Sequence, residues 1–419
     1  MPALRLRAPW LLPVVGPPIA DGAVLVGDDG RILAIGPHQT IPEPPGVPSE
    51  RFPDAVILPG LVNAHTHLEL TGYGGQVQED DFPAWIRRIR QLKAERTPAG
   101  FSEAARAGLR ACWASGVTTI ADTGDSGAVI EALAAAGGSG IVYHEVFGPD
   151  PAQCGESLAR LEQRVTDLTR YTGDRVRLGV SPHAPYTVSG PLYRAVAAYA
   201  DREDLPMAVH LAESAAETAL IASGSGPFAE AWRGRAIPLP DDLSHLDRPL
   251  PIRTPVRWLE AHGVLGPETL AIHLVQVDPE DIHLLVRYDV AVAHCPLSNA
   301  RHGHGEAPLR QLLSAGLRVG LGTDSEASVG ALDLFAEARA ARRIGDLTAA
   351  ETLSLMTLDG AIAIGMQDVG CLAEGAWGDL TVVGVPVPAD RPVEEAVLGA
   401  GLASVRVTFL AGREVWRRA

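Results

Sequence analysis

Cysteine is scarce in this sequence, and long uninterrupted apolar runs are absent. The four cysteines are widely scattered and include no Cys-x-x-Cys pair, which favours a reduced protein over a disulfide framework. No segment approaches the roughly 18 consecutive apolar residues of a membrane-spanning helix. Prolines interrupt the apolar stretch near the amino terminus, so a secretory signal peptide is not expected. We therefore expect a soluble, cytoplasmic protein.

Positive charge is also in deficit. The chain has 51 Asp and Glu against 35 Lys and Arg, a formal net charge of −16, whereas nucleic-acid-binding proteins present basic faces. We expect neither a nucleic-acid nor a membrane partner; a small-molecule substrate and a homo-oligomer stay open. The length of 419 residues and the hydrophobic content of 46% allow a large core and more than one structural unit.

The two ends of the chain have the pattern of β-structure. The segment "GAVLVGDDGRILAIGP" alternates around a "DDG" turn signal, which is typical of a β-hairpin. The tail contains the similar short runs "GDLTVVGV" and "VRVTFLAGREVWRR". This pattern predicts a small β-domain built from residues 1–56 and 372–419, with residues 57–371 inserted as a larger domain.

The middle of the chain alternates strand-like and helix-like segments. We count eight strand candidates, at residues 61–67, 117–124, 140–148, 176–185, 206–214, 269–277, 289–298 and 318–325. Amphipathic stretches lie between most of them, and Asp278 is a predicted helix N-cap. Eight such units in series fit a parallel (β/α)8 barrel, although alternation alone also fits a doubly wound sheet.

Chemically useful side chains recur where these strands end. His65 and His67 stand two apart on the first strand, so their side chains point the same way. The ends of later strands carry the following residues: His183, His210 with Glu213, His273 and Asp324. In a barrel these ends converge on one mouth, where active sites of this architecture lie. An open sheet would string them along an edge, so the pattern favours the barrel.

Four of these side chains form a candidate metal site: His65, His67, His210 and Asp324. Three imidazoles and one carboxylate suit zinc, with iron as the alternative, and they leave a position open for water. A single buried histidine is more often a core residue than a ligand. We therefore interpret the histidines on helix-like, loop-like or mid-strand segments as structural: His144, His245, His262 and His283.

Several motifs together resemble the amidohydrolase superfamily: "PGLVNAHTHLEL", "VHLAES", "IHLVQV", "HCPLSNARHGHG" and "GLGTDSEAS". Within it they are most similar to the branch of 6-aminodeoxyfutalosine and adenosine-type deaminases and triazine chlorohydrolases. The resemblance spans nearly the whole chain and implies a distorted (β/α)8 TIM barrel with a small β-sandwich formed from both termini. Relatives with two metals carry a lysine at the end of strand four. Here that segment is "SPHAPYTVS", so the resemblance implies one divalent metal.

The resemblance also implies roles for the catalytic residues Glu213, His273 and Asp324. A metal-activated water attacks a ring carbon, and Asp324 accepts the proton of that water. Glu213 protonates a ring nitrogen and shuttles the proton to departing ammonia, while His273 hydrogen-bonds the nucleophile. Asn299 is expected to support this site. The alternative zinc signature, H-x-E followed by P-C-x-x-C, does not occur because the chain has no C-x-x-C.

The substrate-binding candidates rest on weaker patterns. His183 resembles a histidine that touches substrate, although a loop histidine paired to backbone is an equal alternative. Trp85 lies on a predicted lid helix and covers a heteroaromatic ring or belongs to the core. Glu69 follows the metal strand directly and is predicted at the start of the pocket. Arg88 of the lid helix and Arg301 compete for a carboxylate on the substrate.

The resemblance implies hydrolytic deamination of an adenine-type nucleoside, with 6-aminodeoxyfutalosine on the route to menaquinone as the first choice. Adenosine, methylthioadenosine and S-adenosylhomocysteine are near alternatives. A triazine chlorohydrolase or another hydrolase of cyclic C–N bonds is the competing enzyme class, and Glu213 favours deamination because ammonia needs a proton to leave. A non-catalytic scaffold is disfavoured because His65, His67 and Asp324 are all present.

Overall fold

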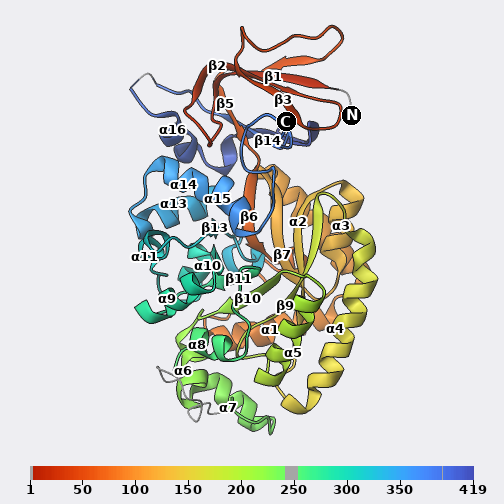
Figure 1. Cartoon of the computed structure of the whole chain (residues 1–419), viewed down its shortest axis with the longest axis vertical. Coiled ribbons are helices and arrows are strands. Elements are labelled where there is room, and N and C mark those ends of the chain that lie inside the picture. Colours follow the sequence, from red (N-terminus) through yellow and green to blue (C-terminus); the bar gives the residue numbers. More distant parts are fainter. Residues whose placement is uncertain (1–2, 241–252, 389) are drawn as a thin grey trace.

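Both ends of the chain join in one mixed sheet (Figure 1). The computed structural model describes residues 3–240, 253–388 and 390–419. The sheet's strands are β1 (Leu4–Leu11), β2 (Ile19–Val26), β3 (Ile32–Pro37), β4 (Ser49–Arg51), β5 (Ala55–Pro59), β14 (Leu380–Gly384), β15 (Val405–Leu410) and β16 (Arg413–Arg417). Their order is β16-β15-β14-β5-β1-β2-β3, with β4 paired to β1. The antiparallel pair of β5 and β14 joins the two ends of the chain.

The predicted β-domain of the two termini is confirmed, although the first predicted boundary, after residue 56, lies inside β5. The exact domain limits stay a prediction. A core of its own holds the sheet together, in which Leu6, Val24, Ile57, Val382 and Phe409 are buried against one another. Alternate residues of each strand therefore supply one apolar face.

The middle of the chain folds into a parallel barrel. Its strands are β6 (Leu61–Thr66), β7 (Val117–Gly124), β8 (Ser139–Val146), β9 (Val176–Pro182), β10 (Met207–Leu211), β11 (Thr269–His273), β12 (Ala291–His294) and β13 (Val319–Leu321). They pair in sequence order from β6 to β13. The backbone amides of Thr323 and Asp324 donate to the carbonyl of His65 and bring the last strand back to the first. The barrel prediction is confirmed, and the doubly wound sheet is excluded.

Helices surround the barrel and cover it (Figure 1). They are α1 (Phe82–Glu95), α2 (Pro98–Ala114), α3 (Ala128–Ala136), α4 (Cys154–Leu168), α5 (Gly190–Arg202), α6 (Ala215–Ser223), α7 (Gly226–Gly234), α8 (Pro255–Ala261), α9 (Pro279–Arg287), α10 (Pro296–Arg301), α11 (Leu309–Ser314), α12 (Glu326–Val329), α13 (Leu334–Gly345), α14 (Ala349–Leu355), α15 (Leu358–Ala363) and α16 (Val393–Ala400). Asp278 caps α9 as predicted, in a reciprocal capping box with Asp281. None of the helices in the described ranges is long and apolar enough to cross a membrane.

Candidate metal and active site

The four predicted metal ligands meet at the carboxyl ends of the barrel strands. His65 lies on β6 and His67 directly follows it, His210 comes from β10, and Asp324 from the turn after β13. The Nε2 atoms of His67 and His210 are 3.2 Å apart. The Oδ1 atom of Asp324 lies 3.6 Å from Nε2 of His67 and 3.9 Å from Nε2 of His65. Residues separated by up to 259 positions therefore share one small site.

The protonation pattern of the rings leaves lone pairs facing one another. Nδ1 of His67 donates to the carbonyl of Thr123 at 2.9 Å, and Nδ1 of His210 donates to the carbonyl of His183 at 3.2 Å. Both Nε2 atoms of these neutral rings therefore carry lone pairs and have no hydrogen to share between them. Nε2 of His65 is also buried without a partner. Burial lowers the pKa of His210 to about 3, which keeps that ring neutral.

Three converging lone pairs and a carboxylate fit a divalent cation. Such a cation would offset the repulsion between the facing nitrogen lone pairs. Asp324 is oriented for this role because its other oxygen, Oδ2, accepts hydrogen bonds from Ser298 and Ser328 at 2.5 and 3.1 Å. Two other triads of potential ligand atoms overlap with this set: His65, His210 and His273, and His67, Glu145 and His210.

Glu213 lies just beyond β10 and is surrounded by groups that hold its carboxylate. The hydroxyl of Tyr186 donates to its Oε2 at 3.1 Å. Nε2 of His304 and Nε2 of His273 lie 3.4 and 3.5 Å from its Oε1. Burial raises the pKa of Glu213, but the two histidines outweigh it and hold that pKa well below its usual range. Nδ1 of His273 is 2.9 Å from the side-chain oxygen of Asn299, so the ring has a defined orientation.

Backbone strain accumulates at these strand ends. Ala212, His273 and Asp324 have φ angles of 52°, 79° and 58°, in a left-handed region that costs a residue with a side chain about 1–3 kcal/mol. Compensating hydrogen bonds hold two of them. The Ala212 amide donates to the buried Glu217 carboxylate, and the Asp324 amide donates to the carbonyl of His65. Strain of this kind is typical of functional sites.

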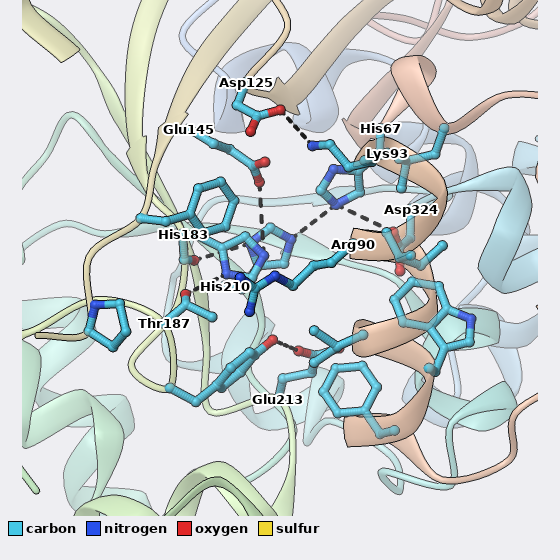
Figure 2. Close-up of a pocket in the computed structure, with 18 of the residues that line it drawn as sticks. His67, Arg90, Lys93, Asp125, Glu145, His183, Thr187, His210, Glu213 and Asp324 are labelled. Atoms are coloured by element: carbon cyan, nitrogen blue, oxygen red, sulfur yellow. Dashed lines mark hydrogen bonds and ion pairs between the residues drawn. The ribbon is translucent and has the colours of Figure 1, made fainter. Parts of the chain in front are cut away.

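A cavity of about 620 Å³ opens from the metal site (Figure 2). Trp85 and His183, two predicted substrate contacts, both line it. Its aromatic and apolar wall consists of Leu70, Phe82, Trp85, Ile86, Ile89, Phe101, Phe147 and Tyr186. The predicted catalytic residues Glu213, His273 and Asp324 line the same cavity. A mostly apolar cavity with a few convergent polar groups is typical of a small-molecule site.

Glu69 lies behind the cavity wall instead of on it. Its Oε1 accepts from Nζ of Lys93 at 2.5 Å, and its Oε2 accepts from the amide and the hydroxyl of Ser126 at 3.0 and 2.5 Å. Lys93 also pairs with Asp125 at 2.6 Å, as Figure 2 shows. Protein donors occupy both oxygens, and Glu69 is not among the described residues that line the cavity, whereas the sequence predicts it at the start of the pocket.

Neither of the two arginines predicted to compete for a substrate carboxylate is among the described residues that line the cavity. Arg88 lies roughly 200° around α1 from Ile86, a residue of the cavity wall. It therefore points to another side of the helix and is not among the described residues that line the cavity. Arg301 pairs with Asp80 at 3.3 Å on the surface. Within the described ranges, the arginines that line the cavity are Arg90 and Arg235.

The sequence assigns no role to Arg90, Tyr186 and His302, which line the cavity, or to His304, which lies beside Glu213. The two histidines lie in the quoted "HCPLSNARHGHG" segment, and their alternation was the available signal. The histidines interpreted as structural stay away from the cavity where they are described. His144 is buried in β8, His283 is exposed, and Nδ1 of His262 bonds the carbonyl of Trp258 at 2.7 Å. His245 lies outside the described residues.

Comparison with known proteins agrees with this geometry. A model of the amidohydrolase family matches residues 56–415. The chain belongs to the amidohydrolase family. An amidohydrolase from Deinococcus radiodurans, named aminodeoxyfutalosine deaminase, is 35% identical over 328 residues, which cover 77% of this chain and 76% of the relative. A 5-methylthioadenosine/S-adenosylhomocysteine deaminase of Desulfitobacterium hafniense is 30% identical over 404 residues, which cover 93% and 86%.

A solved amidohydrolase structure has the same fold. The adenosine deaminase of Xanthomonas campestris, with bound zinc, superposes with a TM-score of 0.81 at 25% identity and covers 98% of this chain and 92% of its own. The present chain is accordingly a hydrolase that acts on carbon–nitrogen bonds in cyclic amidines, and its relatives are nucleoside deaminases.

Proposed function

We propose that this amidohydrolase deaminates an adenine-type nucleoside, and that its substrate is 6-aminodeoxyfutalosine on the route to menaquinone. The observation that carries the proposal is Glu213, a buried carboxylate held beside the histidine-rich metal site at the base of an aromatic cavity. The aminodeoxyfutalosine deaminase of Deinococcus radiodurans, 35% identical, supports this choice of substrate.

The residues of the site account for the proton transfers of such a reaction. When bound by the four ligands, a divalent ion acts as a Lewis acid and lowers the pKa of water toward neutrality. Glu213 is ionised at rest, so its carboxylate accepts a proton from the attacking water and delivers it to a ring nitrogen of the base. A second proton transfer to the exocyclic amine lets ammonia leave, and the ring keeps the oxygen.

The neighbours of Glu213 hold the reacting groups in place. His273, oriented by Asn299, presents Nε2 beside Glu213 and bonds the oxygen that adds to the ring. Asp324 has Oδ2 engaged by two serines, which leaves Oδ1 for the metal site and for the second proton of the water, which passes to the exocyclic amine. Phe82 and Trp85 supply the apolar faces against which a purine packs.

We further propose zinc as the metal, with iron as the alternative, and a cytoplasmic location. The donor set of three imidazoles and one carboxylate supports zinc, as does the zinc in the Xanthomonas campestris relative. A triazine chlorohydrolase is the competing activity on the same ligands. A chlorohydrolase releases chloride, whereas a deaminase releases ammonia, so product analysis separates the two.

The first test replaces the shuttle. We expect Glu213→Gln to keep its full metal content and to lose about 10²–10⁴-fold in kcat, because the amide can neither accept nor return the proton. Metal analysis and ammonia release measure the two quantities. The exposed Glu203→Gln is the matched control and should behave as the unmodified protein. Full turnover in Glu213→Gln would refute the proposed mechanism.

The second test addresses the substrate. Ultraviolet absorbance follows the loss of the 6-aminopurine in a panel of 6-aminodeoxyfutalosine, adenosine, 5′-deoxyadenosine, methylthioadenosine and S-adenosylhomocysteine. We expect the highest kcat/KM for 6-aminodeoxyfutalosine. A higher value for methylthioadenosine would leave the deaminase assignment intact and overturn the choice of substrate.

A further inference from the structure

Two arginines face the cavity without an anionic partner. Arg90 belongs to α1 and Arg235 follows α7, and both line the cavity. Among the described residues, neither guanidinium has a hydrogen bond or an ion pair. Lys93, the third cation of the wall, differs because it is bound to Glu69 and Asp125. Positive charge at the cavity is therefore available to a ligand, in a chain whose net charge is −16.

The phase of α1 explains why Arg90 faces the cavity. Residues four apart lie on one side of a helix, and Phe82, Ile86 and Arg90 form such a row, all three in contact with the cavity. Arg87 and Arg88 lie on other rows, and neither is among the described lining residues. Figure 2 shows the Arg90 side chain reaching from α1 into the cavity.

The cavity has room for more than a purine ring. Its volume of about 620 Å³ is in the range that holds drug-sized ligands. If the amino group of the base lies at Glu213, the rest of the cavity is left for the ribose and the substituent beyond it, and Arg90 and the rings of Phe101 and Phe147 are among the residues that line this cavity. An apolar arm that ends in an anion fits this part of the cavity.

We propose that Arg90, assisted by Arg235, forms an anion subsite that selects nucleosides with a carboxylate on the arm beyond the ribose. This inference rests on the proposed deaminase function. A guanidinium matches a carboxylate with two parallel N–H···O bonds, and the unpaired state of both arginines leaves those donors free. The local positive charge also offsets the repulsion that a strongly acidic protein exerts on an anionic substrate.

The test compares 6-aminodeoxyfutalosine with its methyl ester, which lacks the negative charge of the distal group and carries one additional methyl group. We expect Arg90→Gln to lower kcat/KM for the acid about 10- to 100-fold, mainly through KM, and to change kcat/KM for the ester less than about threefold. Arg235→Gln should give a smaller loss of the same kind. Arg87→Gln, an exposed arginine on another face of the same helix, is the matched control and should change neither value.

Several outcomes would overturn the subsite. Equal losses of kcat/KM on the acid and on the ester would show that Arg90 acts on folding or on the reaction and not on the carboxylate. In that case Arg90→Lys, which retains the positive charge, should restore no activity toward the acid. An unmodified protein that does not prefer the acid over the ester would refute the subsite and leave the deaminase assignment standing. If no nucleoside is deaminated, the proposed function fails, and calorimetric binding of the acid then decides the subsite alone: weaker binding to Arg90→Gln supports it, and equal binding refutes it.

Discussion

The side chains around Glu213 keep its buried carboxyl group ionised. Tyr186 donates to one of its oxygens, and His273 and His304 lie within 3.5 Å of the other. Proton transfer from water needs the ionised form as acceptor. Activity should therefore fall as pH drops through the pKa of Glu213, and that pKa is held low by its neighbours. His304 is a neighbour that is neither a proposed metal ligand nor a proposed catalytic residue.

Replacing His304 should move the acidic limb of the pH profile. His304→Gln removes a group that lowers the pKa of Glu213, so this pKa rises and the acidic limb of kcat/KM shifts to higher pH. The exposed His283→Gln is the control and should leave the limb in place. A profile of kcat/KM against pH measures both variants. A limb that stays unmoved in His304→Gln would contradict the assigned role.

At the scale of elements, α1 forms one wall of the cavity and is tied to the barrel by a buried ion cluster. Lys93 in its last turn contacts Glu69 after β6 and Asp125 after β7. Burial raises the pKa of Glu69, but Lys93 and Ser126 outweigh it and lower this pKa to about 2. A folded-state pKa below the unfolded value stabilises the fold above about pH 4.5, and this stabilisation is lost as pH falls toward 2.

Lys93→Met should destabilise the protein strongly, because it leaves Glu69 charged and buried without its cation. Breaking one side of a buried pair costs about 3–5 kcal/mol of unfolding free energy. Chemical denaturation at neutral pH measures the loss. The double variant with Glu69→Gln should recover part of it, and the exposed Arg87→Met is the control for a change of charge on the same helix. A stability equal to that of the unmodified protein would show that the cluster does not hold α1.

The sequence predicts where helices and strands lie better than it predicts which side of a helix faces the cavity. All eight barrel strands were foreseen, because short apolar runs that end in polar residues mark buried parallel strands. Convergence of strand ends then brought His65, His210 and Asp324 together. Helix phase can be computed for α1, but which side of the helix meets the cavity depends on packing. The sequence therefore points to Arg88, whereas the structure places Arg90 on the cavity wall. Loop positions such as Arg301 depend on backbone conformation that no local pattern encodes.

At the scale of the molecule, the metal ligands span the seam where the barrel closes. His65 lies on the first strand with His67 directly after it, Asp324 follows the last strand, and His210 comes from β10 between them. Among the described strands, the pairing of β6 with the β13 segment consists of one bridge between Thr66 and Asp324. A cation held by these ligands would link both sides of the seam. Metal binding should therefore stabilise the whole barrel and not only the site.

Removing the metal should lower the melting temperature. A ligand at about 1,000 times its Kd stabilises the folded state by about 4 kcal/mol, which corresponds to a shift of about 5 °C or more for a domain of this size. Differential scanning calorimetry of chelator-treated protein, before and after titration with zinc, iron or manganese, measures the shift and ranks the metals. Asp324→Asn should lose most of the zinc-induced shift, whereas the exposed Asp346→Asn should keep it. An unchanged melting temperature on chelation and reloading would mean that the cation, if bound, does not bridge the seam.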